Sequence, residues 1–190
     1  MTMAQSLRVL SSLLALWAIP ALAHPVDELG QASYVGITPS AVAIELSLTP
    51  GEQLARPFAA LNAKPDYPQQ VLTELSLSLD GKPLALNLVQ KPLTVGEQST
   101  KLFFSAPLVS LPGGRHTLRY ENHHAPLKSA YLAATLAGTD GIQIGQQTHD
   151  ATQQTLTIEF QAPAPQTSAL PWLIGVALLL CAGYGWFRPR

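Results

Sequence analysis

Apolar and polar residues alternate at a period of two through the middle of the chain. Apolar residues occupy every second position in 42–48 and again in 75–79, with polar or small residues between them. This period places side chains alternately on the two faces of a strand, so both runs predict half-buried β-strands. Asp80-Gly81 follows the second run, and a further alternating run spans 84–88. Asp-Gly between two such runs predicts a tight hairpin, because both turn positions tolerate positive φ.

Shorter runs of the same kind predict the remaining strands. They are expected at residues 33–37, 101–105, 116–121, 129–136, 142–145 and 155–160. Residues 52–61 differ, because their apolar spacing is helical and they contain no β-branched residue. That segment predicts a short helix or an ordered loop between strands. Short strands separated by Pro and Gly turns predict an all-β fold: an antiparallel, immunoglobulin-like sandwich with a short helical insertion.

The first 23 residues have the composition of a secretory signal peptide. Arg8 precedes an apolar run, and Ala21-Leu22-Ala23 is the small-x-small pattern that signal peptidase cleaves. The apolar run is too short to span a bilayer, which takes about 20 helical residues. Cleavage after Ala23 would make His24 the first residue of the mature protein.

A second apolar segment follows the middle of the chain. Residues 161–169 are rich in proline and predict a stiff linker. The segment 170–187 begins at Leu170, ends at Phe187 and contains no charged residue. With a rise of about 1.5 Å per residue it would form a helix about 27 Å long, close to the hydrocarbon thickness of a bilayer. Arg188 and Arg190 follow, and basic residues mark the cytoplasmic side.

These two ends predict a single-pass protein of the bacterial inner membrane. Residues 24–160 would form its periplasmic domain, 170–187 its transmembrane helix and 188–190 a cytoplasmic tail. Two alternatives fit the same C-terminal residues. One is a helix buried in a protein core, and the other is a sorting tail that is removed during export to the cell surface.

Composition narrows what the middle of the chain can do. Its length of about 145 residues is that of one ordinary domain. The only cysteine, Cys181, lies in the second apolar segment, so the middle has no disulfide and no thiol chemistry. Residues 24–169 hold all 12 acidic residues and only eight of the 11 basic ones. An acidic domain is a poor partner for nucleic acid or anionic lipid.

Motifs of enzymes are absent from the sequence. It has no nucleotide-binding loop, no nucleophile elbow and no His-Glu-x-x-His helix. The adjacent carboxylates Asp27 and Glu28 are expected to be solvated, and no spacing links Ser, His and Asp residues into a triad. We therefore expect a non-enzymatic protein without a bound cofactor.

His24 is the strongest candidate for metal chemistry. As an N-terminal residue it would present a free amine and an imidazole, which together chelate Cu(II) or Ni(II). Pro25 has no amide N–H, which excludes binding through a deprotonated second amide but leaves this chelate available. His123 and His124 are further candidate ligands, although adjacent residues of an extended chain point to opposite sides. The alternative is that His24 merely follows the cleavage site.

Several short motifs resemble one family of exported proteins. His24-Pro25-Val26-Asp27-Glu28 and the segment 41–50, which ends Leu-Ser-Leu-Thr-Pro, resemble the start of periplasmic domains on bacterial nickel/cobalt-permease-like proteins of the hydrogenase and urease accessory type. Residues 77–84 and 121–124 are similar to related exported proteins, and the likeness covers most of 24–160. Those permeases continue into several membrane helices, whereas this sequence predicts one, at 170–187. The resemblance implies a free-standing relative of the outer domain, with metal handling by analogy.

Two functions are consistent with these observations. The first is a non-enzymatic, membrane-anchored periplasmic binding or interaction domain, serving a membrane protein partner such as a metal permease. The alternative is a Cu- or Ni-binding accessory protein that uses the mature N-terminal histidine.

Overall fold

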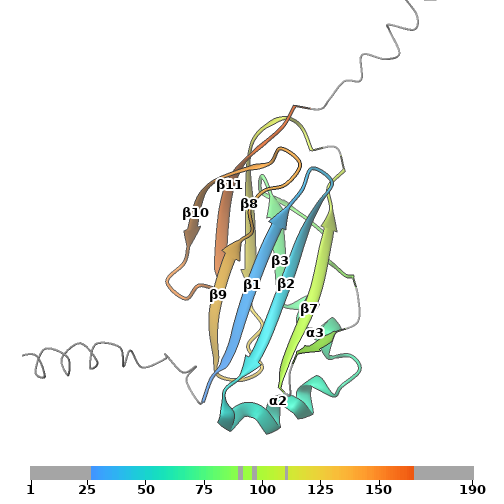
Figure 1. Cartoon of the computed structure of the whole chain (residues 1–190), viewed down its shortest axis with the longest axis vertical. Helices are drawn as coiled ribbons and strands as arrows, with labels where there is room; N and C mark the ends of the chain where they lie inside the picture. Colours follow the sequence, from blue (N-terminus) through green and yellow to red (C-terminus); the bar gives the residue numbers. More distant parts are fainter. Residues whose placement is uncertain (1–26, 90–91, 96–97, 110, 165–190) are drawn as a thin grey trace, which may run out of the picture.

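Two β-sheets pack face to face in the computed structural model, which describes residues 27–89, 92–95, 98–109 and 111–164 (Figure 1). Sheet A contains, in spatial order, β5 (Asn87–Leu88), β7 (Ser99–Pro107), β2 (Ala41–Pro50), β1 (Leu29–Ile37) and β9 (Ser129–Thr135), with β6 (Leu93–Val95) also paired to β7. Sheet B contains β10 (Gln143–His149), β11 (Thr155–Ala162), β8 (Gly114–Asn122), β3 (Leu75–Leu79) and β4 (Lys82–Pro83). The predicted all-β sandwich is confirmed. The neighbouring strands pair antiparallel except β1 and β9, which are parallel.

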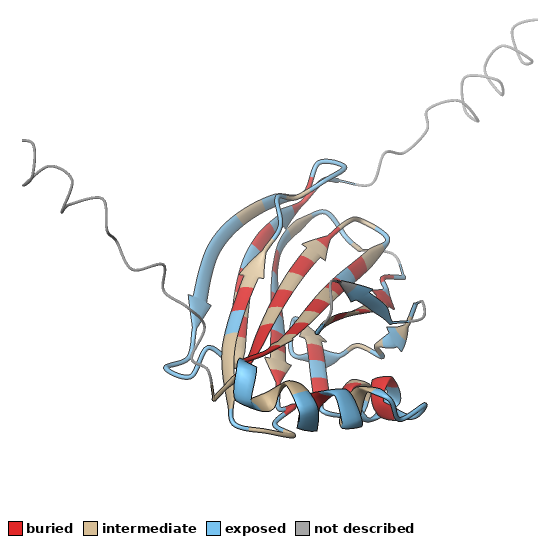
Figure 2. Cartoon of the chain, turned by 60° about the horizontal axis from the view of Figure 1, so that its bottom comes forward, coloured by how far each residue is buried: buried red, intermediate tan, exposed pale blue. Residues whose placement is uncertain are grey.

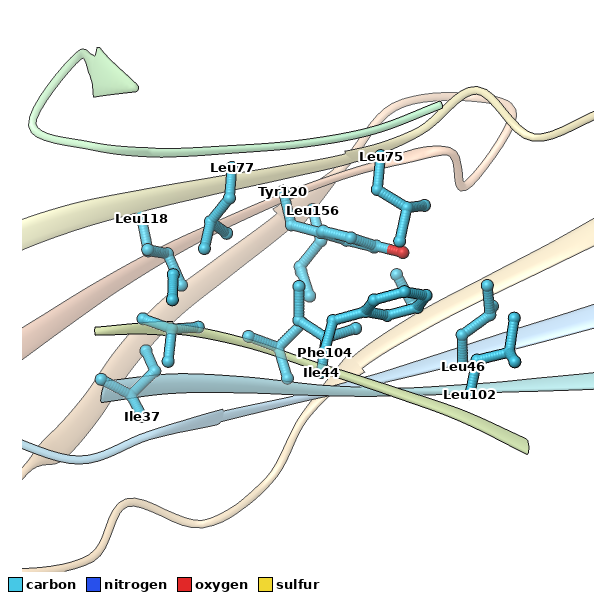
Figure 3. Close-up of a cluster of buried hydrophobic side chains, with 14 of the residues drawn as sticks. Ile37, Ile44, Leu46, Leu75, Leu77, Leu102, Phe104, Leu118, Tyr120 and Leu156 are labelled. Carbon is cyan, nitrogen blue, oxygen red and sulfur yellow. The ribbon is translucent and has the colours of Figure 1, made fainter. Parts of the chain in front are cut away.

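The alternation in the sequence determines which side chains fill the space between the sheets. Along β2 every second residue from Val42 to Pro50 is buried, and the residues between them are half-buried or exposed (Figure 2). Ile44 and Phe104 from sheet A meet Leu77 and Tyr120 from sheet B in the core (Figure 3). Each such side chain stabilises the fold by about 1.5–3 kcal/mol through removal from water.

The Asp80-Gly81 hairpin is present, but the run after it does not form the expected strand. Asp80 and Gly81 have φ of 50° and 75°, the pair of positive angles that a type I′ turn requires. Pairing within sheet B ends at Pro83, and the chain then crosses to pair with β7 in sheet A at Asn87. Leu84 and its neighbours at 86 and 88 are all partly buried against the core along this crossing.

Two short helices lie across one end of the sandwich (Figure 2). A 3-10 turn, η1 (Glu52–Leu54), continues into α2 (Ala55–Asn62), so the predicted helical insertion is present. A second helix, α3 (Tyr67–Thr73), was not expected. It begins with Pro68 in its first turn, where the missing N–H costs nothing. Phe58 of α2 packs edge-on against Tyr67 of α3, and both rings are buried.

The described chain begins near these helices and ends at the opposite end of the sandwich (Figure 1). Strand β11 continues to Ala162, so it includes the first two residues of the expected linker. Within the described ranges no helix is long and apolar enough to cross a membrane. The predicted signal peptide, 1–23, and the predicted transmembrane helix, 170–187, both lie outside those ranges.

Candidate functional site

The histidines predicted as metal ligands occupy very different surroundings. His24 lies outside the described residues, so its metal binding stays a prediction. His123 is 61% exposed, with its Nε2 3.9 Å from Oε2 of Glu121, whereas His124 is buried and points the other way. Among the residues that the structure describes, no three His, Cys, Asp or Glu side chains are grouped so that they could hold a metal ion.

His124 is a buried ring at the centre of a chain of hydrogen bonds. Its Nδ1 lies 2.6 Å from Oε2 of Glu74, and its Nε2 lies 2.9 Å from the hydroxyl of Tyr67. Because a carboxylate only accepts hydrogen bonds, Nδ1 carries the proton and the Tyr67 hydroxyl donates to Nε2. Burial lowers the pKa of His124, with Glu74 acting in the opposite direction. The ring is therefore neutral and hydrogen-bonded at both nitrogens.

The backbone at His124 is held by a second set of polar groups. Its carbonyl oxygen accepts hydrogen bonds from Nε2 of Gln31 at 2.7 Å and from the hydroxyl of Tyr131 at 2.9 Å. Its N–H donates to Oδ1 of Asn122, whose Nδ2 donates to Oε1 of Gln31. We call these residues the buried polar network, in which Glu74 is 46% exposed and Tyr131 half-buried while the other four are buried: Gln31, Tyr67, Glu74, Asn122, His124 and Tyr131.

Tyr67, His124 and Glu74 are hydrogen-bonded in a row, so a hydroxyl, an imidazole and a carboxylate follow one another as they do in a catalytic triad. A nucleophile must reach its substrate, however, and Tyr67 is only 1% exposed and packed against Phe58. Burial and the nearby Glu74 carboxylate also raise the pKa of Tyr67, which keeps the hydroxyl protonated. This arrangement is suited to fastening α3 to the loop after β8, and we assign it that structural role.

His116 is buried on β8, and both of its ring nitrogens face acceptors. Nδ1 lies 2.8 Å from Oδ2 of Asp80, and Nε2 lies 2.9 Å from the carbonyl oxygen of Pro112. Two acceptors require two N–H groups, so the geometry selects the imidazolium form. The hydrogen bond to Asp80 accordingly raises the pKa of His116. Burial opposes ionisation of Asp80, but hydrogen bonds from His116 and the Thr117 backbone outweigh it and lower the pKa of that carboxyl.

Replacing His116 with Gln should therefore reduce stability most at acidic pH. A raised pKa in the folded state means that the stabilisation is complete below the unfolded value, about 6.5, and is lost as pH rises through the folded pKa. We expect the difference in free energy of unfolding between wild type and His116→Gln to shrink as the pH rises above about 6.5. Urea unfolding at several pH values measures it. A difference that stays constant would show that His116 is not held as an imidazolium.

The outward surface of sheet A is the second candidate site. The outward positions of β1, β2, β7 and β9 carry mostly small or apolar side chains, among them Ala32, Tyr34, Gly36, Ala43, Ser47, Phe103, Ser105, Leu132 and Ala134. We call this surface the outer face of sheet A. Glu45 and Lys101 are the only charged residues at the outward positions of these four strands as described, and they form an ion pair with each other. The face as a whole is electrically neutral.

Tyr34 divides this face into two shallow hollows. The first has a volume of about 360 Å³, with Ala43 among its lining and the larger side chains of Tyr34, Phe103, Val89 and Leu136 around it. The second, of about 260 Å³, lies between Tyr34 and Leu132 over glycine and alanine positions of β1 and β9. Val89, Leu132 and Leu136 are each half or more exposed. Apolar side chains thus surround floors made by small residues.

The outward surface of sheet B is different in character. Arg115, Arg119 and Glu159 are exposed on β8 and β11, and Arg119 forms an ion pair with Glu121 at 2.6 Å. Threonine residues lie between these charges on the same strands. This face has the composition of an ordinary hydrated surface. The contrast identifies the outer face of sheet A as the candidate functional site.

Comparison with known proteins assigns this chain to no family. No protein-family model matches the chain, and no curated protein matches its sequence. The fold class of the described residues, an all-β sandwich, comes from the structure alone. The resemblance to permease outer domains stays a prediction.

Sequence reasoning concentrated on histidines and missed the outer face of sheet A. Its residues occupy the outward positions of each alternating run, such as Ala43, Glu45 and Ser47 between the buried positions of β2. The available signal was that these intervening positions carry so few charges in β1, β2, β7 and β9, in contrast to β8. Strand register was needed to show that they form one continuous surface.

Proposed function

We propose that this chain is a non-enzymatic binding domain, exported and held at the bacterial inner membrane by segment 170–187, that binds a protein through the outer face of sheet A. The observation that carries the proposal is the contrast between the two outward faces: one neutral and rich in apolar and small residues, the other charged. Exposed apolar patches of this kind mark interaction sites, because monomeric proteins rarely leave them in contact with water.

The chemistry of the outer face favours a protein partner. Aromatic side chains are enriched at the centre of protein interfaces, and Tyr34 and Phe103 lie near the middle of this face, in one row with Glu45 between them. Glu45 and Lys101 already neutralise each other, so covering them leaves no unpaired charge. Each 100 Å² of apolar area removed from water would contribute about 2.5 kcal/mol before the costs of association.

The proposed topology and location are compatible with this role. Two sheets of short, mainly antiparallel strands support an immunoglobulin-like relationship in the broad sense. With segment 170–187 in the bilayer, the end of the sandwich that carries Ala164 would lie nearest the membrane (Figure 1). The outer face of sheet A runs from that end to the helices, so a membrane protein or another tethered domain beside it could reach it.

Site-specific photo-crosslinking in the protein's own cells tests the proposal. A photoreactive amino acid replaces Ala43, which is exposed in the first hollow, in the full-length chain. We expect a protein adduct from this position. The matched control is Thr117, which is also exposed but lies on sheet B, and should give none. Absence of an adduct at Ala43, or equal adducts at both positions, would contradict binding through this face.

A further inference from the structure

We propose that the protein bound to the outer face of sheet A is a second copy of this chain. The two copies stack face to face about a two-fold axis that lies in the interface plane, between sheet A of one copy and sheet A of the other. This inference rests on the proposed function, because it names the partner of the same face. It is carried by two properties of the face: its charges are complementary to themselves, and projections and hollows both occur on it.

The charge argument starts from the register of β2 and β7. Glu45 lies opposite Phe103 and Ser47 lies opposite Lys101, so the ion pair runs diagonally across the two strands. A two-fold axis through the middle of this diagonal, and perpendicular to it, places Glu45 of each copy over Lys101 of the other. A strongly acidic or basic partner would leave one of these two charges facing a like charge, which is costly in a covered interface. An identical face matches both.

The face also has both the projections and the hollows that a face-to-face dimer needs. Tyr34, Phe103 and Leu132 project from it, and the two hollows of about 360 and 260 Å³ lie between these projections. Small floor residues, such as Ala43 in the first hollow, leave room for a side chain of the facing sheet. In a two-fold interface each copy contributes the same surface, so projections and hollows must occur on one face, as they do here.

The size of the face predicts a weak dimer that the membrane would strengthen. Four strands about 4.8 Å apart, over about 25 Å of their length, present a planar area of about 500 Å². Two copies would bury about 1,000 Å², the lower limit for specific interfaces. Tethering to one membrane holds copies together and raises their effective concentration, so a contact of this size can be populated there.

Charge reversal in the full-length protein tests the proposal. Two differently tagged copies, each with the photoreactive residue at position 43, are co-expressed and illuminated in intact membranes, so that copies in contact are joined while they are still tethered. The membranes are then solubilised, and recovery of one copy with the other is measured. Glu45→Lys leaves two lysines on every face, and Lys101→Glu leaves two glutamates, so each variant should recover its own second copy at least about tenfold less than wild type. Co-expressing Glu45→Lys with Lys101→Glu should restore recovery, because each lysine then meets a glutamate of the other chain.

Controls separate this contact from other causes. Arg119→Glu breaks a comparable exposed ion pair on sheet B and should leave recovery unchanged. Thermal unfolding of each variant verifies that it is folded. As a second measurement, Ser47→Cys near the axis, in a Cys181→Ser background, should form a disulfide-linked dimer on oxidation, whereas Ser78→Cys on sheet B should not.

Three results would overturn the second-copy proposal. They are a wild type that does not recover itself, single variants that associate as well as wild type, and a loss that the mixed variants do not restore. The second result would assign association to another segment, such as 170–187. An Ala43 adduct with a different protein, combined with any of these, would leave the binding function standing, whereas no adduct at all would remove both.

Discussion

Replacing His124 with Ala should destabilise the domain by about 3–5 kcal/mol. The change leaves a cavity where the imidazole was, which alone costs a few kcal/mol for a large buried side chain. It also leaves the buried Tyr67 hydroxyl without the acceptor at 2.9 Å, which adds about 1–3 kcal/mol. Because a domain of this size is stable by only about 5–15 kcal/mol, the loss is a large part of the total. Urea unfolding of the fragment 24–164 gives the value directly.

The neighbouring residue provides a matched control for this prediction. His123→Ala removes the same atoms one position earlier, from a side chain that is 61% exposed, and should change stability by no more than about 0.5 kcal/mol. Tyr67→Phe removes one hydrogen bond without opening a cavity and should cost about 1 kcal/mol. If His124→Ala were as mild as His123→Ala, the buried polar network could not be what fastens α3 to the sheets.

The pH dependence of this effect has a defined sign. Burial lowers the pKa of His124 in the folded state, so the unfolded chain binds the proton more readily. The stability contributed by the neutral ring is present above the unfolded pKa, about 6.5, and is lost as pH falls below it. His116, whose pKa is raised, acts in the opposite direction. The two histidines therefore shift stability oppositely around neutral pH.

The strands could be predicted because their cause is local. Alternation in 42–48 and 75–79 reports which face of a strand is buried, and the structure places β2 and β3 there. The helix at 52–61 was predicted for the same reason. The crossing at 84–88 was not, because partly buried leucines that pass between two sheets have the same spacing as leucines on one strand. Helix α3 is too short for its periodicity to be distinctive.

The buried polar network could not be predicted because its cause is not local. Tyr67 and Glu74 lie 57 and 50 positions before His124, and nothing in the residues between them indicates that they meet. His123 and His124 looked alike in sequence, and only the packing of the chain after β8 separates an exposed ring from a buried one. The outer face of sheet A likewise depends on which strands become neighbours.

Deleting residues 168–190 should move the protein almost completely from the membrane fraction to the periplasmic fraction. The apolar segment 170–187 supplies nearly all of the expected membrane affinity, because about 20 apolar residues are enough to span a bilayer. The acidic middle of the chain is not attracted to anionic lipid and supplies little. Cell fractionation followed by immunoblotting measures the redistribution.

A milder change in the same segment gives a graded control. Leu178→Arg places a charge near its centre, which costs about 2.5–3.5 kcal/mol on insertion scales, and should reduce the membrane fraction less than the deletion does. Leu178→Ile keeps the segment apolar and should leave the distribution unchanged. A truncated protein that stays with membranes after a high-salt wash would mean that another element holds it. A different outcome is recovery of the unaltered gene product at the cell surface without its C-terminal peptide. That result would identify 170–187 as a removable sorting signal, because a permanent anchor is not cleaved.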